Sequence, residues 1–197
     1  MKMQASYTLR TRRNENKMKS RMLISITAIT VLAAVAIPQQ FAAQDNRDDK
    51  QAKIVTFEAP QSGTGLGQGT RALVINPAGA ITGNDVDAGG VFHGYLRSPD
   101  GSFTIFDAPG AGTAANQGTG GFGINPAGVI TGFYIDTNNA MHGFVRAKHG
   151  DITTFDAPGA GTGASQGTEP LANNPAGAVT GFYIDADNVF HGFLRTP

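Results

Sequence analysis

The chain has 197 residues, with 27 glycines, 10 prolines, no cysteine and no tryptophan. The lack of cysteine excludes a disulfide framework, a thiolate nucleophile and a zinc or iron–sulfur site held by cysteine. Basic and acidic side chains balance overall, but residues 44–197 hold eight basic and fourteen acidic ones. Because this acidic part has no cluster of Lys and Arg, nucleic acid is not an expected partner.

Residues 1–43 have the order of an export signal. Basic residues up to Arg21 precede an apolar run from Met22 to Ile37, and Pro38 and the small pair Ala42-Ala43 follow. This order predicts an N-terminal signal helix, cleaved near Ala43. Sixteen helical residues span about 24 Å, less than the ~30 Å apolar core of a membrane. An uncleaved segment that anchors the protein is the alternative, and would be its only contact with a membrane.

The predicted signal implies a product outside the cytoplasm, as a secreted, periplasmic or cell-surface protein. Residues 44–53 follow the predicted cleavage point and are polar and charged. They have too few apolar side chains to order themselves by burial, so we expect a flexible leader.

Residues 54–197 contain short motifs that return every 49 residues. Asn-Pro-Ala-Gly begins at Asn76, Asn125 and Asn174, and His-Gly begins at His93, His142 and His191. A Phe-acid-Ala-Pro motif and a Gln-Gly-Thr motif recur with the same spacing. A fixed period of this length predicts a domain of three equivalent units.

Each unit has the pattern of four short antiparallel strands. In the middle unit, apolar runs at 122–124, 129–136, 141–146 and 152–155 are separated by turn residues at 126–128, 137–139 and 148–150. Runs of this length between turn residues are typical of hairpins. The second run has apolar side chains on both faces, which favours sheets packed between neighbours. We therefore predict an all-β fold of β-propeller-like blades, with a β-trefoil-like fold as the alternative.

The ends of the domain suggest how the last unit is completed. The segment 54–58 is equivalent to a fourth strand, and the chain ends after the third strand of the last unit. We expect strand 54–58 to pair with 190–195 and close the third unit. Propellers typically have four to eight blades, so three units predict a homodimer that forms a six-bladed ring. An open arc with exposed edges is the alternative.

The motifs also carry a resemblance to a known family. The run from Ile124 to Gly132, Ile-Asn-Pro-Ala-Gly-Val-Ile-Thr-Gly, and the run His142-Gly-Phe-Val-Arg146 resemble bacterial extracellular repeats of the HAF type. The chain departs from that family at Gly94, Gly143 and Gly192, which stand where the family has Ala. The resemblance implies secretion and a propeller-like β fold over 54–197, and it implies no activity.

Oxygen-bearing side chains gather at the second turn of each unit. Their Asp-x-Asp/Asn spacing is similar to the start of a calcium loop, although the Gly and the distal Glu of such a loop are missing. The same residue types also cap ordinary β-turns. Calcium is the one cofactor that the sequence suggests, and its candidate ligands are Asp85, Asp87, Asp136, Asn138, Asp185, Asp187 and Asn188. The recurring His93, His142 and His191 suit either a metal or hydrogen bonds within the sheet.

No set of residues in the sequence points to catalysis. Equivalent units provide like carboxylates, whereas glycosidases need two carboxylates in unlike surroundings. The residues that break the repeat, among them Arg71, Asn84 and Glu169, do not suggest a shared site. We therefore expect a non-enzymatic protein that binds a glycan or another protein. A propeller-type extracellular hydrolase or lyase, or a fragment of a longer array, are the alternatives.

Overall fold

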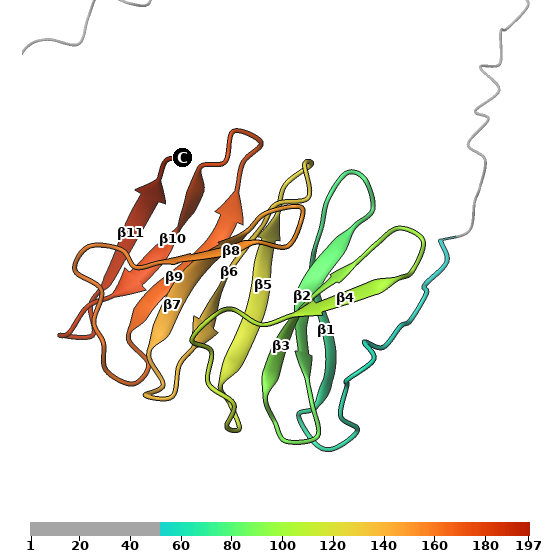
Figure 1. Cartoon of the computed structure of the whole chain (residues 1–197), viewed down its shortest axis with the longest axis horizontal. Helices are drawn as coiled ribbons and strands as arrows, with labels where there is room; N and C mark the ends of the chain where they lie inside the picture. Colours follow the sequence, from blue (N-terminus) through green and yellow to red (C-terminus); the bar gives the residue numbers. More distant parts are fainter. Residues whose placement is uncertain (1–51) are drawn as a thin grey trace, which may run out of the picture. The chain divides into compact units, whose positions relative to one another are not determined.

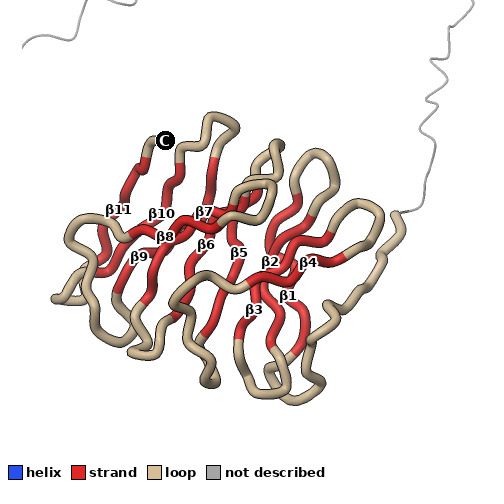
Figure 2. Tube along the Cα trace, in the orientation of Figure 1, coloured by secondary structure: helices blue, strands red, loops and turns tan. Residues whose placement is uncertain are grey.

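The computed structural model describes residues 52–197, and these residues form one open, mixed β-sheet of eleven strands. Figures 1 and 2 show strands and loops alone in this part of the chain, so the predicted all-β class is confirmed. The predicted signal at 1–43, and the predicted leader up to residue 51, lie outside the described residues. Among residues 52–197, no helix is long and apolar enough to cross a membrane.

The strands follow one another with short turns between them. They are β1 (Gly69–Ile75), β2 (Ile81–Val86), β3 (Phe92–Arg97), β4 (Phe103–Phe106), β5 (Gly118–Ile124), β6 (Ile130–Ile135), β7 (Met141–Arg146), β8 (Ile152–Phe155), β9 (Gly167–Asn173), β10 (Val179–Ile184) and β11 (Phe190–Arg195).

Nine of these strands form three antiparallel meanders of the same design. The first meander is β1–β3, the second is β5–β7 and the third is β9–β11. The hairpin that opens the second meander shows why the chain turns there. Gly128 has a φ of 82°, which favours glycine, and its N–H donates to the Asn125 carbonyl at 2.9 Å. Strand residues before and after the turn are mostly β-branched, aromatic or glycine, so the turn and the strands agree.

The last strands of the first two meanders, β3 and β7, each pair with two different partners along their outer edge. Gly94–Arg97 of β3 pair antiparallel with β4, while Phe92 at the other end of β3 pairs parallel with Gly118 of β5. Strand β7 is divided in the same way between β8 and β9. As a result, β4 and β8 lie across one face of the sheet in Figure 1, and the meanders follow one another in a row.

Asparagine side chains connect the opening turns of successive meanders. Asn76 Nδ2 donates to the Asn125 carbonyl at 3.1 Å, and Asn125 Nδ2 donates to the Asn174 carbonyl at 3.1 Å. Each of these amides also accepts a hydrogen bond from its own turn through Oδ1, as from Val129 N to Asn125 at 3.0 Å. Asn76 and Asn125 are buried, so these bonds satisfy groups that would otherwise be costly to bury.

The core lies where a crossing strand meets the next meander. Phe106 of β4 packs edge-on against Phe144 of β7 at a centroid distance of 5.9 Å, and Ile130 and Tyr134 of β6 belong to the same cluster. The Arg146 guanidinium lies 4.9 Å from the centre of the Phe106 ring. Each crossing strand is therefore held between the meander before it and the meander after it.

The prediction that strand 54–58 pairs with 190–195 is wrong for a single chain. Residues 54–58 form no strand, and β11 pairs only with β10. The Phe57 ring packs instead against Phe103 at 5.9 Å and under the Arg97 guanidinium at 4.6 Å, near the opposite end of the sheet. The 49-residue period identifies equivalent strands, but it does not determine how far the sheet curves. Because the sheet stays open, the two ends of the described chain do not meet.

The asparagine connection gives a stability prediction. Asn125→Ala removes the bond to the third meander and leaves the Val129 N–H without its side-chain acceptor. We expect it to lower the free energy of unfolding by about 2–3 kcal/mol, as for lost buried hydrogen bonds. The matched control is Asn174→Ala, because the exposed Asn174 caps its own turn and donates to no further meander among the described residues. It should cost less than half as much in urea denaturation, and equal losses would contradict the connection.

Candidate functional site

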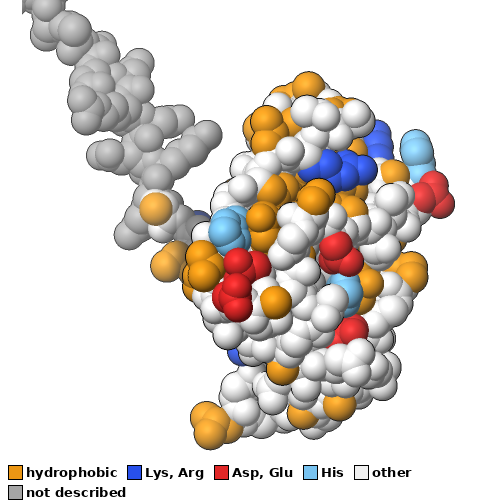
Figure 3. Space-filling view, turned by 90° about the vertical axis from the view of Figure 1, so that its left-hand side faces the viewer, with side chains coloured by type: hydrophobic (Ala, Val, Ile, Leu, Met, Phe, Trp, Pro, Cys, Tyr) orange, Lys and Arg blue, Asp and Glu red, His pale blue; other side chains and the backbone are white. Residues whose placement is uncertain are grey.

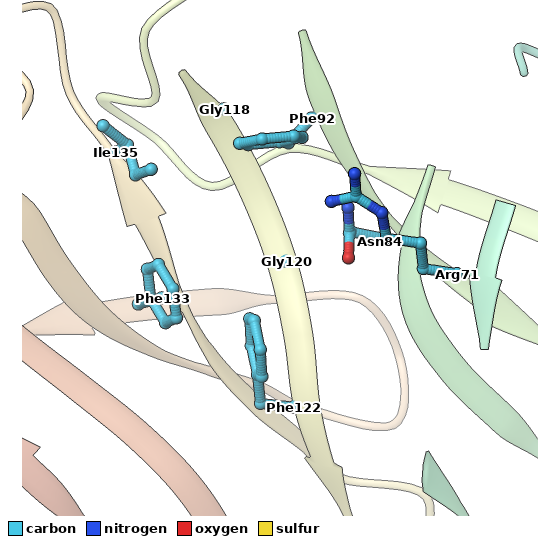
Figure 4. A pocket seen from close by; sticks show the side chains of 8 residues that line it. All are labelled: Arg71, Asn84, Phe92, Gly118, Gly120, Phe122, Phe133 and Ile135. Carbon is cyan, nitrogen blue, oxygen red and sulfur yellow. The ribbon is translucent and has the colours of Figure 1, made fainter. Parts of the chain in front are cut away.

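A pocket of about 200 Å³ lies between the first and second meanders. Strands β1 to β3 provide one wall and β5 and β6 provide the other, as Figure 4 shows. Its lining combines aromatic rings with one guanidinium and one amide, and consists of Arg71, Asn84, Phe92, Gly118, Gly120, Phe122, Phe133 and Ile135.

The polar part of the pocket comes from two residues that break the 49-residue pattern. Arg71 on β1 and Asn84 on β2 are direct partners in the antiparallel ladder, and Figure 4 shows their side chains together. The equivalent positions in the second meander hold Gly120 and Phe133. The sequence identifies Arg71 and Asn84 as exceptions to the repeat but does not show that they are neighbours. Their proximity depends on the strand register, which the sequence alone does not determine.

Asn84 and Arg71 differ in their exposure. Asn84 is only 6% exposed and lines the wall of the pocket. Arg71 is exposed, donates from Nη2 to the Gly67 carbonyl at 3.2 Å and lies 5.8 Å from the centre of the Phe92 ring. The pocket is therefore lined by a cation and an amide.

The apolar part of the pocket is a pair of parallel rings. Phe122 and Phe133 stack with centroids 4.7 Å apart and planes 17° from parallel, and both are half-buried. Gly120 has no side chain between these rings and Arg71, and a Cβ at that position would lie 2.8 Å from the Phe122 ring. Glycine on β5 therefore keeps this hollow open.

The recurring histidines join a turn to a crossing strand. His93 Nδ1 lies 3.0 Å from Asp107, and its Nε2 lies 3.5 Å from Asp87. His142 has the same arrangement with Asp156 at 3.0 Å and Asp136 at 3.6 Å. Burial alone would lower the pKa of His93, but the two carboxylates outweigh it and raise that pKa above 6.5. His93 and His142 thus each lie between a carboxylate of a turn and a carboxylate that follows a crossing strand.

The third histidine has only one of these two partners. His191 Nε2 lies 2.9 Å from Asp185 Oδ2, and no carboxylate faces its Nδ1 among the described residues. The first and second histidines use Nδ1 for an aspartate just after β4 or β8, and no strand of that kind follows β11.

Most of the predicted calcium ligands cap turns. Oδ1 of Asp87, Asp136 and Asp185 each accepts two backbone N–H bonds at 2.8–2.9 Å. Such bonds, first of all from Val91 N and Val189 N, lower the pKa of Asp87 and Asp185. Asn138 donates to Asp136 Oδ2, Asn188 accepts from Gln166, and Asp187 adds only its backbone N–H. Within residues 52–197 no three His, Asp or Glu side chains could hold a metal ion together, so calcium stays a prediction from spacing.

Asp85 lies apart from the other predicted ligands. It points into the first meander, is fully buried and accepts a hydrogen bond from Ser62 Oγ. Burial raises its pKa, and its Oδ2 has no partner among the described residues. The equivalent residues Tyr134 and Tyr183 stack on His142 and His191. Asp85 is therefore another departure from the repeat. The prediction that it lies in a turn is wrong, because it is buried on β2.

Comparison with known family models, curated proteins and solved structures finds no match. The resemblance to HAF-type repeats therefore remains a prediction from the motifs. The function has to be argued from the geometry of the chain itself.

The ionic link of His93 predicts a pH-dependent stability. Because the pKa of His93 is raised, protonated His93 stabilises the fold fully below about pH 6.5, and this contribution is lost as the pH rises through the raised value. His93→Gln should therefore lower the free energy of unfolding more at pH 6.0 than at pH 8.5, by roughly 0.2–1 kcal/mol.

The companion variant Asp107→Asn tests the cause of this effect. In that background the pH dependence of the His93→Gln cost should shrink, because the nearest carboxylate has lost its charge. Chemical denaturation of the four proteins at both pH values gives the comparison. A cost that is equal at the two pH values, or larger at pH 8.5, would refute the ionic link.

Proposed function

We propose that the chain is a secreted, non-enzymatic β-repeat protein. Its ligand is an acidic saccharide found outside the cell, which binds in the pocket lined by Arg71 and Asn84. The observation that carries this proposal is the convergence of two repeat-breaking polar residues on a hollow lined by aromatic rings. Export rests on the signal predicted at 1–43. The three meanders with their crossing strands are consistent with propeller-like units, which remain part of this proposal.

The groups in the pocket suit a sugar that carries a carboxylate. Aromatic side chains provide flat apolar surfaces, on which the C–H face of a sugar ring can pack. A guanidinium binds a carboxylate with two parallel hydrogen bonds, which is stronger and more specific than a single neutral bond. The amide of Asn84 provides both a donor and an acceptor for a hydroxyl group.

The position of Asn84 supports a polar ligand. It lines the pocket with little exposed surface, and a hydroxyl of a ligand in the pocket could exchange a hydrogen bond with its amide. The volume of the pocket limits the size of the ligand. Pockets for drug-sized ligands measure roughly 300–1,000 Å³, so this hollow of about 200 Å³ suits one ring of a longer chain. Arg71 at the exposed side is placed to meet a charge on that ring.

Two variants taken from the protein's own repeat test the proposal. Arg71→Gly and Asn84→Phe introduce the residues of the equivalent positions Gly120 and Phe133. Arg71→Gly should weaken binding of an oligogalacturonide trimer about tenfold or more, the cost of a lost charge-assisted hydrogen bond. Asn84→Phe should abolish binding, because the larger side chain fills the pocket. Isothermal titration gives both affinities.

The controls separate the site from general charge effects. Maltotriose, which is neutral, should bind more weakly than the acidic trimer and should be insensitive to Arg71→Gly. Lys148→Ala removes a charge from an exposed turn outside the pocket and should leave the affinity unchanged. No binding of either sugar would refute the proposed function. Release of a shortened or unsaturated sugar would identify the alternative hydrolase or lyase instead.

A further inference from the structure

We propose that copies of this chain associate head to tail, with the tail of one copy covered by the head of the next. The tail is the free edge of β11, and the head is the segment 54–58 together with β1. This inference is independent of the proposed binding function. It rests on two junctions within the chain that show what each end lacks.

The two internal junctions have the same strand pairs, 49 residues apart. At the first, Gly94 pairs with Phe106 and Phe92 bridges to Gly118. At the second, Gly143 pairs with Phe155 and Met141 bridges to Gly167. A third junction of this design would pair Gly192 with Phe57 and Phe190 with Gly69, and all four residues are present at the free ends.

The tail has the surface of a junction that is not filled. Phe190 and Leu194 of β11 are 65% and 71% exposed, whereas the equivalent residues of β7, Met141 and Val145, are buried or half-buried. Thr180 on β10 is also exposed, although its equivalents Thr82 and Thr131 are fully buried under the next meander. An edge strand with apolar side chains is an open template for another strand.

Gly192 is the most specific sign of a missing partner. At the equivalent Gly94 a Cβ would lie 2.5 Å from the Phe106 ring, and at Gly143 it would lie 3.0 Å from the Phe155 ring. A phenylalanine of the crossing strand covers the glycine at both positions, and at Gly143 the Pro170 ring of β9 is closer still, at 2.8 Å. At Gly192 an added Cβ would meet nothing within 4 Å. Within one copy no neighbouring atom requires glycine at this position. Phe57 of another copy would require it, because its ring would cover Gly192.

The head carries the complementary features. Ile54 is 90% exposed, whereas its equivalents Phe103 and Ile152, at the start of β4 and β8, are half-buried. Ile75 on β1 is 64% exposed, while its equivalent Ile124 is 7% exposed. These side chains are uncovered where a preceding meander would lie.

The head is already shaped like a crossing strand. The Arg97 guanidinium lies over Phe57 at 4.6 Å, as Arg146 lies over Phe106 at 4.9 Å. The Ala59 N–H donates to Thr70 Oγ1 at 2.7 Å, as Ala108 donates to Thr119 at 2.9 Å. One side of this segment therefore has its junction contacts in place, and only the side that would face a β3-type strand is free.

Polar groups at the two ends also match. At the internal junctions a histidine Nδ1 lies 3.0 Å from the carboxylate that follows the crossing strand. At the free ends the same two positions hold His191 and Glu58, and Glu58 is exposed. Asn174 Nδ2 and the Asn76 carbonyl would likewise continue the asparagine connection, as in the 3.1 Å bonds inside the chain.

The contact is between two different surfaces, so the pair formed by the first association still has one free head, on one copy, and one free tail, on the other. Such heterologous contacts either close into a ring or continue as a filament. A closed pair would contain six meanders, the number in the ring predicted from the sequence. A longer assembly would use the same contact, and both results would support the proposal.

The test follows the mass of the full chain in analytical ultracentrifugation. The mean mass should rise with protein concentration from about 1 μM to about 200 μM, as mass action requires for weak association. Gly192→Val blocks the tail, because its side chain takes the space of Phe57 from the next copy. Ile54→Lys/Val55→Lys blocks the head, because the internal register would place the first charge opposite Arg195 and the second opposite the apolar Leu194. Both variants carry unchanged residues 1–52, so association through that part would persist in them.

Each blocked variant alone should remain a monomer at all concentrations and keep the melting temperature that the unblocked protein shows when dilute. An equal mixture of the two should form a single species of two copies that does not grow, since one free tail meets one free head.

A monomeric unblocked protein would overturn the proposal. So would a head-blocked variant that still dimerises, because that result would indicate pairing of β11 with β11. Saccharide binding is measured separately, and its failure would leave the mass result unaffected.

Discussion

The division of β3 and β7 between two partners is the constraint on which the rest of the structure depends. Each of these strands gives most of its outer edge to a crossing strand and its first residue to the next meander. The crossing strand is thereby held between two meanders, since Phe106 pairs with Gly94 of β3 and its ring packs against Phe144 and Arg146 of β7. Burial, the asparagine connection and the histidine links all occur at these junctions. The first two meanders are covered by the next one, and the third ends in an edge.

Glycine and asparagine complement the large apolar residues at the junctions. A phenylalanine ring lies against the backbone at Gly94 and at Gly143, and a side chain at either position would collide with that ring. Asn125 satisfies its own turn and the next one with a single side chain. This accounts for a glycine-rich composition in a chain that nevertheless buries a core, and it explains why Gly192 and Asn174 have incomplete surroundings.

The candidate site arises where the first junction departs from the second. Arg71 and Asn84 stand where the second meander has Gly120 and Phe133, and the exchange adds a cation and an amide to the wall of the pocket. Asp85, also in the first meander, replaces a tyrosine and is held by Ser62. The three meanders thus form the scaffold, and two of the residues that depart from the 49-residue pattern line the pocket.

From the sequence alone, the all-β class, the turns and the equivalence of positions 49 residues apart could be predicted, because they depend on local pattern and spacing. The sequence also marked Arg71 and Asn84 as exceptions. It did not show that they are ladder partners, that Asp85 is buried, or that 54–58 and β11 lie at opposite ends of the sheet. Those facts depend on register and on the curvature of the sheet. Both are decided by packing between meanders, which no single segment encodes.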